Sequence, residues 1–153
     1  MIVLNLQKSR KGNNLMEFEF KENLDKELEK LIDNEFEEYA NEHNLSCQYK
    51  RFNCVAKEQN KIVGILTAYT VYDELYIDEL LVLKPFRGKG IGTKLIDQTE
   101  NWAKTQSHLK YINLVTCKFQ APEFYKKCGF ELEFVRENKI TPALTKYFFV
   151  KYI

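Results

Sequence analysis

The sequence predicts an α/β fold in which a mixed β-sheet is flanked by helices. Three observations point to it: apolar residues alternate with polar ones in some segments, they recur at helical spacing in others, and a glycine-rich turn joins one segment of each kind. With 153 residues and a hydrophobic content of 44%, the chain can bury one sizeable core. We therefore expect a single domain over residues 1–153, with residues 1–15 as a tail or a peripheral strand.

The first half of the chain predicts a strand, a helix and a hairpin. Alternation over residues 16–20 indicates a strand, and the apolar residues of 24–40 recur at the spacing of an amphipathic helix. Two strand-like segments, 49–56 and 62–70, are separated by a short polar turn. This arrangement is typical of a β-hairpin.

A β-α-β unit is predicted next. Residues 75–83 form a nearly continuous apolar run, which is typical of a central strand covered on both faces. Residues 91–103 follow helical periodicity, and 111–116 is strand-like again.

The last part of the chain predicts a short helix and two closing strands. Pro122 suits the first turn of a helix that ends near Cys128, and Gly129 stands where a left-handed residue would cap it. The segments 131–135 and 146–152 are the closing strands, joined by a polar loop.

The glycine-rich turn at residues 87–94 carries the strongest functional signal. Glycines let the main chain approach a ligand closely, and the unpaired N–H groups of a helix N-terminus attract an anion. Arg87 and Lys89 add positive charge. The turn therefore predicts a phosphate-binding site. The Walker and dinucleotide-binding motifs both fail by one position, because Thr93 stands where each requires glycine.

Arg87, Gly90 and Gly92 match the Arg/Gln-x-x-Gly-x-Gly/Ala motif, so the turn resembles that of the GCN5-related N-acetyltransferase (GNAT) family, and the chain resembles its small bacterial members. Residues 77–82 are similar to that family's central strand, and residues 121–130 to its second signature. The resemblance implies a mixed sheet whose central strand pair splays apart. It departs at one place, where Lys118 stands instead of the Asn that many members carry.

The resemblance implies acetyl-CoA as the co-substrate, with its pyrophosphate on the glycine-rich turn and its pantetheine beside the preceding strand. The implied cofactor-binding residues are Leu81, Val82, Arg87, Gly88, Lys89, Gly90, Ile91, Gly92 and Thr93.

The resemblance also gives Tyr125 the role of a general acid. An amine acceptor is protonated at neutral pH, so a base is needed, and Asp78 or Glu79 is the candidate, directly or through a water. Because strand side chains alternate between faces, one of these two acids is also a candidate for a simple salt bridge.

The expected activity is transfer of an acetyl group to the primary amine of a small molecule. A protein or peptide amine as the acceptor, and an acyl-CoA-binding module without catalysis, are the alternatives. The sequence does not identify the acceptor, and a homodimer stays open.

Charge and cysteine content exclude several other classes. A formal net charge of +1 predicts no nucleic-acid partner, and no apolar run is long enough to span a membrane. The four cysteines show no C-x-x-C pair and have only two histidines as companions, so we expect no metal site. Without an export signal, reduced thiols are expected, which favours a cytoplasmic protein.

Overall fold

The structure is a computed structural model that describes Met16 and residues 18–153. The chain divides into two units, Met1–Glu35 and Phe36–Ile153. The helices are α1 Lys26–Glu42, α2 Ile91–Lys104 and α3 Pro122–Lys127, with 3₁₀ turns at Lys84–Phe86 and Pro142–Leu144. None of the described helices is both long enough and apolar enough to cross a bilayer.

Helix α1, predicted from its apolar spacing, begins after a capping aspartate. Oδ1 of Asp25 accepts hydrogen bonds from the N–H groups of Glu27 and Leu28, at 3.1 and 3.0 Å. These are two of the donors that a helix start leaves without a main-chain partner.

The strand predicted over residues 16–20 is wrong for the described residues. Met16 and residues 18–20 have no regular structure, and residue 17 and the predicted tail lie outside the described residues. Met16, Phe18 and Phe20 are 80%, 83% and 102% exposed. A strand needs a neighbour to pair with, and alternation in a sequence does not supply one.

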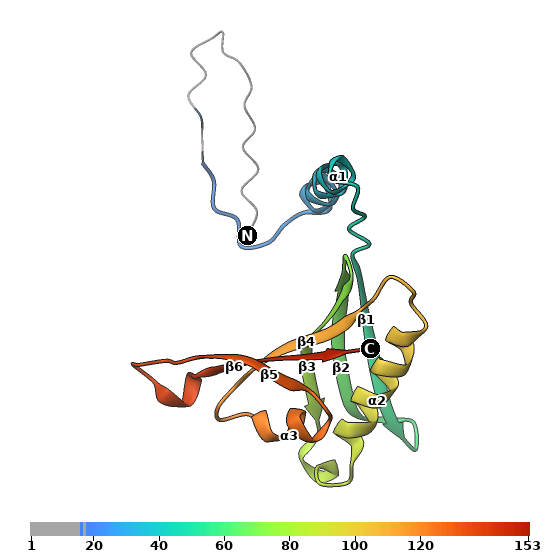
Figure 1. The fold of residues 1–153 in the computed structure, drawn as a ribbon, viewed down its shortest axis with the longest axis vertical. Helices are drawn as coiled ribbons and strands as arrows, with labels where there is room; N and C mark the ends of the chain where they lie inside the picture. The colour runs from blue at the N-terminus through green and yellow to red at the C-terminus, as the bar shows by residue number, and fades with distance from the viewer. Residues whose placement is uncertain (1–15, 17) are drawn as a thin grey trace. The chain divides into compact units, whose positions relative to one another are not determined.

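Residues 36–153 contain one six-stranded mixed sheet with the order β1-β2-β3-β4-β6-β5 (Figure 1). The strands are β1 Lys50–Glu58, β2 Lys61–Val71, β3 Glu74–Val82, β4 Tyr111–Cys117, β5 Glu131–Arg136 and β6 Lys146–Tyr152. Only β3 and β4 pair in parallel, because α2 connects them. The mixed sheet and the β-α-β unit are confirmed.

Two short connections form as their residue types predict. Gln59 and Asn60 link β1 to β2 with φ angles of 48° and 64°, the left-handed conformation of a tight hairpin turn. Gly129 follows α3 with φ of 83°, which confirms the predicted left-handed cap.

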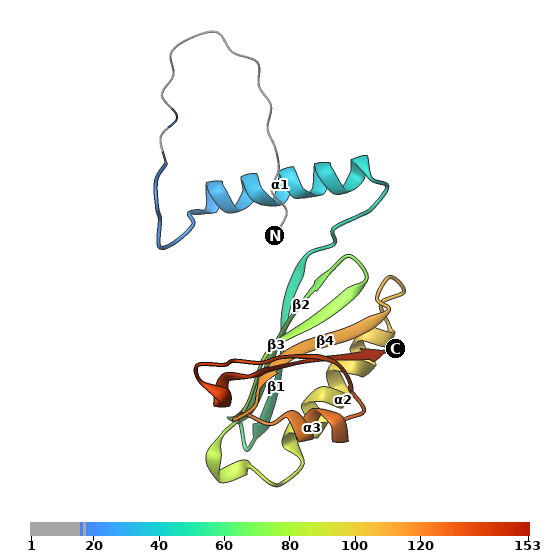
Figure 2. The same ribbon diagram turned by 60° about the vertical axis from the view of Figure 1, so that its left-hand side comes forward.

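Helices α2 and α3 lie on the same face of the sheet (Figures 1 and 2). The core forms beneath them, and its largest fully buried side chains are Leu66, Leu75, Ile96, Ile112 and Phe149. On the opposite face, β3 stays open, because Asp78 and Glu79 are exposed and Leu81 is 46% exposed. The expectation that this strand is covered on both faces is wrong for its second half.

The parallel strands β3 and β4 pair over only part of their length. Glu74 to Ile77 of β3 face Tyr111 to Leu114 of β4, and the register ends there. Both strands continue, to Val82 and Cys117, so they separate. This confirms the predicted splayed pair.

Candidate active site

A cleft of about 830 Å³ opens where β3 and β4 separate. Its walls come from the second half of β3, the glycine-rich turn, the start of α2, the end of β4 and α3. The predicted site residues that line it are Asp78, Glu79, Leu81, Val82, Arg87, Gly88, Gly90, Ile91, Gly92, Thr93 and Tyr125. The fold therefore brings together residues that lie far apart in the sequence.

Main-chain groups of β3 point into the gap. The N–H of Leu83 donates to the oxygen of Val63 on β2, at 2.9 Å. The main-chain N–H and C=O groups of successive strand residues point to opposite edges of the strand. Those of Leu80 and Val82 are therefore directed away from β2, toward the gap. Leu80 also lines the cleft, and sequence reasoning missed it.

The glycine-rich turn has the conformation of an anion-binding loop. Gly88 and Gly90 have φ angles of 74° and 76°, and a Cβ atom at either position would meet no atom within 4 Å. The first hydrogen bond of α2 runs from the N–H of Lys94 to Gly90, at 3.0 Å. The N–H groups of Ile91 to Thr93 are therefore left for a ligand, at the positive end of the helix dipole.

Only one of the two predicted cations lies at the cleft. Arg87 lines it, and its Nε donates to the main-chain oxygen of Val82 at 2.9 Å. This bond anchors the guanidinium beside the end of β3. Lys89 does not line the cleft, and its ammonium lies 5.1 Å from the ring centre of Phe86.

Both acids of β3 share one face because the strand contains a bulge. Thr67 on β2 pairs with Glu79, while the next residue, Ala68, pairs with Ile77, so Asp78 is an extra residue on β3. The expected placement on opposite faces is therefore wrong.

The carboxylate of Glu79 is held by a neighbouring strand. The hydroxyl of Thr67 donates to its Oε2 at 3.3 Å. Neither Asp78 nor Glu79 forms an ion pair with another residue in the described part of the chain. Both carboxylates are thus available to a substrate.

Tyr125 brings a neutral phenol to the cleft. Its ring packs against Phe130 and Phe149, with centroid distances of 6.0 Å in both cases. Burial raises the pKa of the Tyr125 phenol, and electrostatic interaction with the neighbouring Cys128 adds to the rise. The group therefore stays protonated at neutral pH, as a proton donor must.

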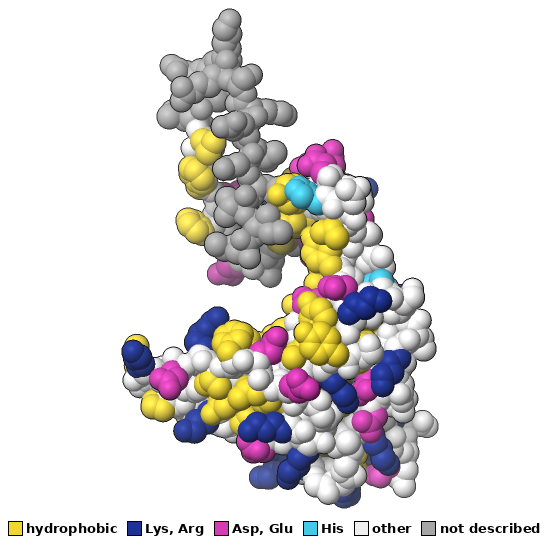
Figure 3. Space-filling model, viewed as in Figure 1, with side chains coloured by type: hydrophobic (Ala, Val, Ile, Leu, Met, Phe, Trp, Pro, Cys, Tyr) yellow, Lys and Arg dark blue, Asp and Glu magenta, His cyan; other side chains and the backbone are white. Residues whose placement is uncertain are grey.

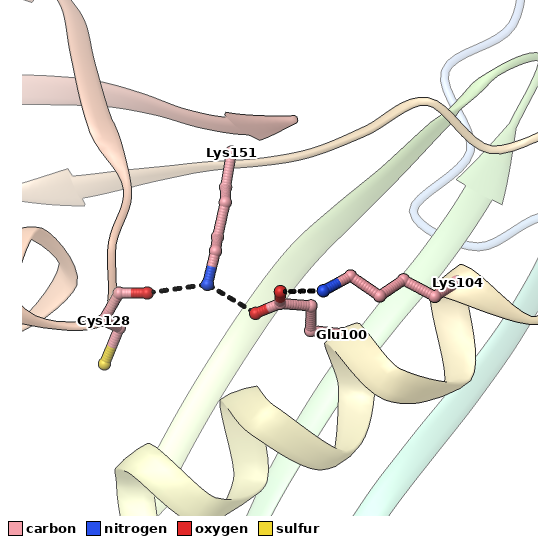
Figure 4. A network of polar contacts seen from close by, with 4 residues as sticks. All are labelled: Glu100, Lys104, Cys128 and Lys151. Atoms are coloured by element: carbon pink, nitrogen blue, oxygen red, sulfur yellow. Dashed lines mark hydrogen bonds and ion pairs between the residues drawn. The ribbon is translucent and has the colours of Figure 1, made fainter. Parts of the chain in front are cut away.

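The end of α3 is tied to α2 and β6 by a polar network (Figure 4). Nζ of Lys151 donates to the main-chain oxygen of Cys128 at 2.9 Å and also contacts the carboxylate of Glu100. Lys104 binds the other oxygen of that carboxylate at 2.7 Å. Sequence reasoning missed this network, although Glu100 lies one helical turn after buried Ile96.

Two cleft residues next to the second signature were also missed. Phe119 and Gln120 line the cleft, and the side-chain oxygen of Gln120 accepts a hydrogen bond from the N–H of Cys117 at 2.8 Å. Lys118 does not line the cleft, and its N–H donates to the oxygen of Thr145.

Residues 15–130 match the sequence model of the acetyltransferase (GNAT) family. Among curated proteins, the blasticidin-S acetyltransferase of Streptomyces morookaense is 30% identical over 94 residues, which are 61% of this chain and 68% of the relative.

Solved structures show the same architecture. An acetyltransferase from Bacillus cereus ATCC 14579 superposes with a TM-score of 0.70 at 29% identity, over 88% of this chain and 98% of that one. A protein of Bacillus anthracis str. Ames, assigned as a streptothricin acetyltransferase and solved with acetyl coenzyme A, gives 0.61 at 25% identity, over 67% and 62%.

Proposed function

The chain belongs to the acetyltransferase (GNAT) family and uses acetyl-CoA as co-substrate, and we propose that its acceptor is the primary amine of a small molecule. One observation supports the proposal most. The cleft at the splayed strands is lined at once by an anion-binding turn, two unpaired carboxylates and a neutral phenol. The relative named for blasticidin S acts, by that name, on a small molecule.

The residues present fit acetyl-CoA. The N–H groups at the start of α2, with Arg87, suit the pyrophosphate, and the open space at Gly88 and Gly90 leaves room for it. The main-chain groups of Leu80 and Val82 suit the amides of the pantetheine. The bound co-substrate supplies a thioester, whose carbonyl carbon is open to attack by an amine.

The acceptor must first lose a proton. An amine with a lysine-like pKa costs between about 4 and 5 kcal/mol to deprotonate at neutral pH. Glu79 or Asp78 takes this proton, directly or through a water. No described residue that lines the cleft is a histidine, so these carboxylates carry the task.

The transfer itself needs a donor and a charge stabiliser. The amine nitrogen forms a bond to the carbonyl carbon and loses its second proton to solvent, and the carbon–sulfur bond breaks. A main-chain N–H of β3 stabilises the negative charge that develops on the carbonyl oxygen. Tyr125 gives its phenolic proton to the departing thiolate, and the catalytic acid is then restored from solvent.

A panel of acceptors tests the proposal. Thiol release from acetyl-CoA is followed with aminoglycosides, polyamines, amino acids and peptides at equal concentration. We expect release with small amines. Thiol release with peptides alone would favour a protein acceptor instead. Tight acetyl-CoA binding without thiol release in the presence of any amine would favour the binding module.

A further inference from the structure

A ladder of tyrosine rings crosses the open face of the sheet beside the cleft. Tyr69 on β2 pairs with Tyr76 on β3, and their rings stack at a centroid distance of 5.1 Å. Tyr49, which precedes β1, adds a third ring 5.8 Å from Tyr69. On the face drawn in Figure 3, hydrophobic side chains lie over the sheet with both acidic and basic groups around them.

Two carboxylates flank this ladder on β3. Glu74 lies two residues before Tyr76, and the bulged Asp78 lies two residues after it. Burial raises the pKa of the Tyr76 phenol, and the negative charges of Asp78 and Glu74 raise it further, as they do for Tyr69. The rings are therefore neutral, and the negative charges lie close to them.

Glu74 is fixed but has no cation of its own. Its Oε2 accepts hydrogen bonds from Nδ2 of Asn113 at 2.8 Å and from the hydroxyl of Tyr111 at 3.2 Å. In the described part of the chain, neither Glu74 nor Asp78 forms an ion pair. Arg51, whose Nε donates to the hydroxyl of Tyr49 at 2.9 Å, lies close enough to Asp78 to interact with it electrostatically, so Glu74 is the carboxylate without a neighbouring cation.

We propose that Glu74, Tyr69 and Tyr76 form a subsite for a second cationic group of the acceptor. The substrate is then a diamine or polyamine and not a monoamine, and this inference rests on the function proposed above. Aromatic faces attract an ammonium, and an adjacent carboxylate without a cation completes its neutralisation. Asp78 belongs to both the cleft and this face, so the subsite is continuous with the reacting centre.

The strand sets the distance between the two amino groups. Tyr76 lies three residues before Glu79, and a strand rises about 3.3 Å per residue. The bulge at Asp78 shortens this path. The two nitrogen atoms of a fitting acceptor are therefore on the order of 10 Å apart.

A binding experiment tests the subsite without any turnover. Calorimetry compares bis-trimethylammonium alkanes of increasing length with the mono-trimethylammonium alkane of the same length, using the full chain. These probes cannot be acetylated. We expect the bis-cation with nitrogens about 10 Å apart to bind roughly five- to thirty-fold more tightly than its mono-cation partner.

Variants assign the preference to the named residues. Tyr76→Leu and Glu74→Gln should each reduce the ratio of the two dissociation constants, whereas Tyr76→Phe keeps the ring face and should retain it. Glu58→Gln, at the end of β1, is the matched charge control and should retain it too. Equal affinities for both probes in the wild type, or a ratio that survives Tyr76→Leu with an unchanged melting temperature, would overturn the subsite.

Turnover separates this inference from the proposed function. Thiol release should show a higher kcat/KM for the diamine than for the monoamine of equal length. Equal kcat/KM values would leave the acetyltransferase in place and overturn the subsite. If none of the amines causes thiol release, the proposed function is overturned, while the calorimetric ratio still decides whether the face binds a dication.

Discussion

The ammonium of Lys151 on β6 contacts the carboxylate of Glu100 on α2 (Figure 4). The contact is largely shielded from water, since the Lys151 and Glu100 side chains are 22% and 12% exposed. The same ammonium binds the oxygen of Cys128 at the end of α3. Because α3 carries Tyr125, this pair connects the stability of the fold to the placement of the proposed acid.

Lys151→Met should lower the free energy of unfolding by about 1–3 kcal/mol, because it leaves the Glu100 carboxylate and the Cys128 oxygen without this donor. Lys104→Met is the matched control. The Lys104 side chain is 51% exposed, and ion pairs of exposed side chains contribute about 1 kcal/mol or less. Urea unfolding measures both, and equal losses would contradict the structural role of Lys151.

Acid should remove the contribution of Glu100. Burial raises the pKa of Glu100, but hydrogen bonds from Lys104 and Lys151 outweigh it and lower the pKa. A carboxyl whose pKa is lower in the folded state stabilises the fold above its unfolded pKa, near 4.3, and loses this effect as the pH falls. The free energies of unfolding of Glu100→Gln and the wild type should therefore converge below about pH 4. A constant difference between them from pH 7 to pH 3 would contradict this role of Glu100.

Arg87→Ala should weaken acetyl-CoA binding by about tenfold or more, because a charge-assisted contact to the pyrophosphate is lost. Lys94→Ala, one turn into α2 and outside the cleft lining, should change the dissociation constant less. Calorimetric titration with acetyl-CoA measures both. An unchanged constant for Arg87→Ala would remove this residue from the pyrophosphate site.

Glu79→Gln should lower kcat/KM by about 100-fold, and Asp78→Asn should lower it less. The reason is that Thr67 fixes the Glu79 carboxylate, while Asp78 lies in the bulge. Thr67→Val, which removes the hydroxyl and keeps the shape, should lower kcat as well. The rates are measured at neutral pH with one good acceptor. Wild-type kcat/KM in the double variant would show that neither acid is the base.

Tyr125→Phe should lower kcat by about 100-fold and leave the affinity for acetyl-CoA unchanged, because only the acidic hydroxyl is lost. Tyr147→Phe, on β6 and outside the cleft lining, is the control for losing a hydroxyl from a half-buried tyrosine. Steady-state kinetics and a binding titration separate the two effects. An unchanged kcat would return Tyr125 to a packing role.

Much of the fold follows from local patterns in the sequence. Helix α2 and strand β6 lie where periodicity predicts them, and Gly129 adopts the left-handed conformation that its position indicates. These features depend on neighbours along the chain. The glycine-rich turn was found for the same reason.

The remaining features depend on neighbours across the sheet, which the sequence does not show. The bulge at Asp78 arises from the register between β2 and β3, so alternation wrongly separates the two acids. Apolar and polar residues alternate over 16–20 as they do in a strand, but the described residues of this segment form no strand. Arg87 donates to the main-chain oxygen of Val82, and because every residue has such an oxygen, the sequence does not indicate this partner.

The fate of the acetyl group shows whether the chain transfers it to an amine. The chain is incubated with acetyl-CoA that carries a labelled acetyl carbon, together with a diamine whose nitrogens lie about 10 Å apart. The label should appear in an amide of the diamine, in amounts equal to the thiol released. Label that remains in acetyl-CoA, or appears only as free acetate, would contradict this transfer.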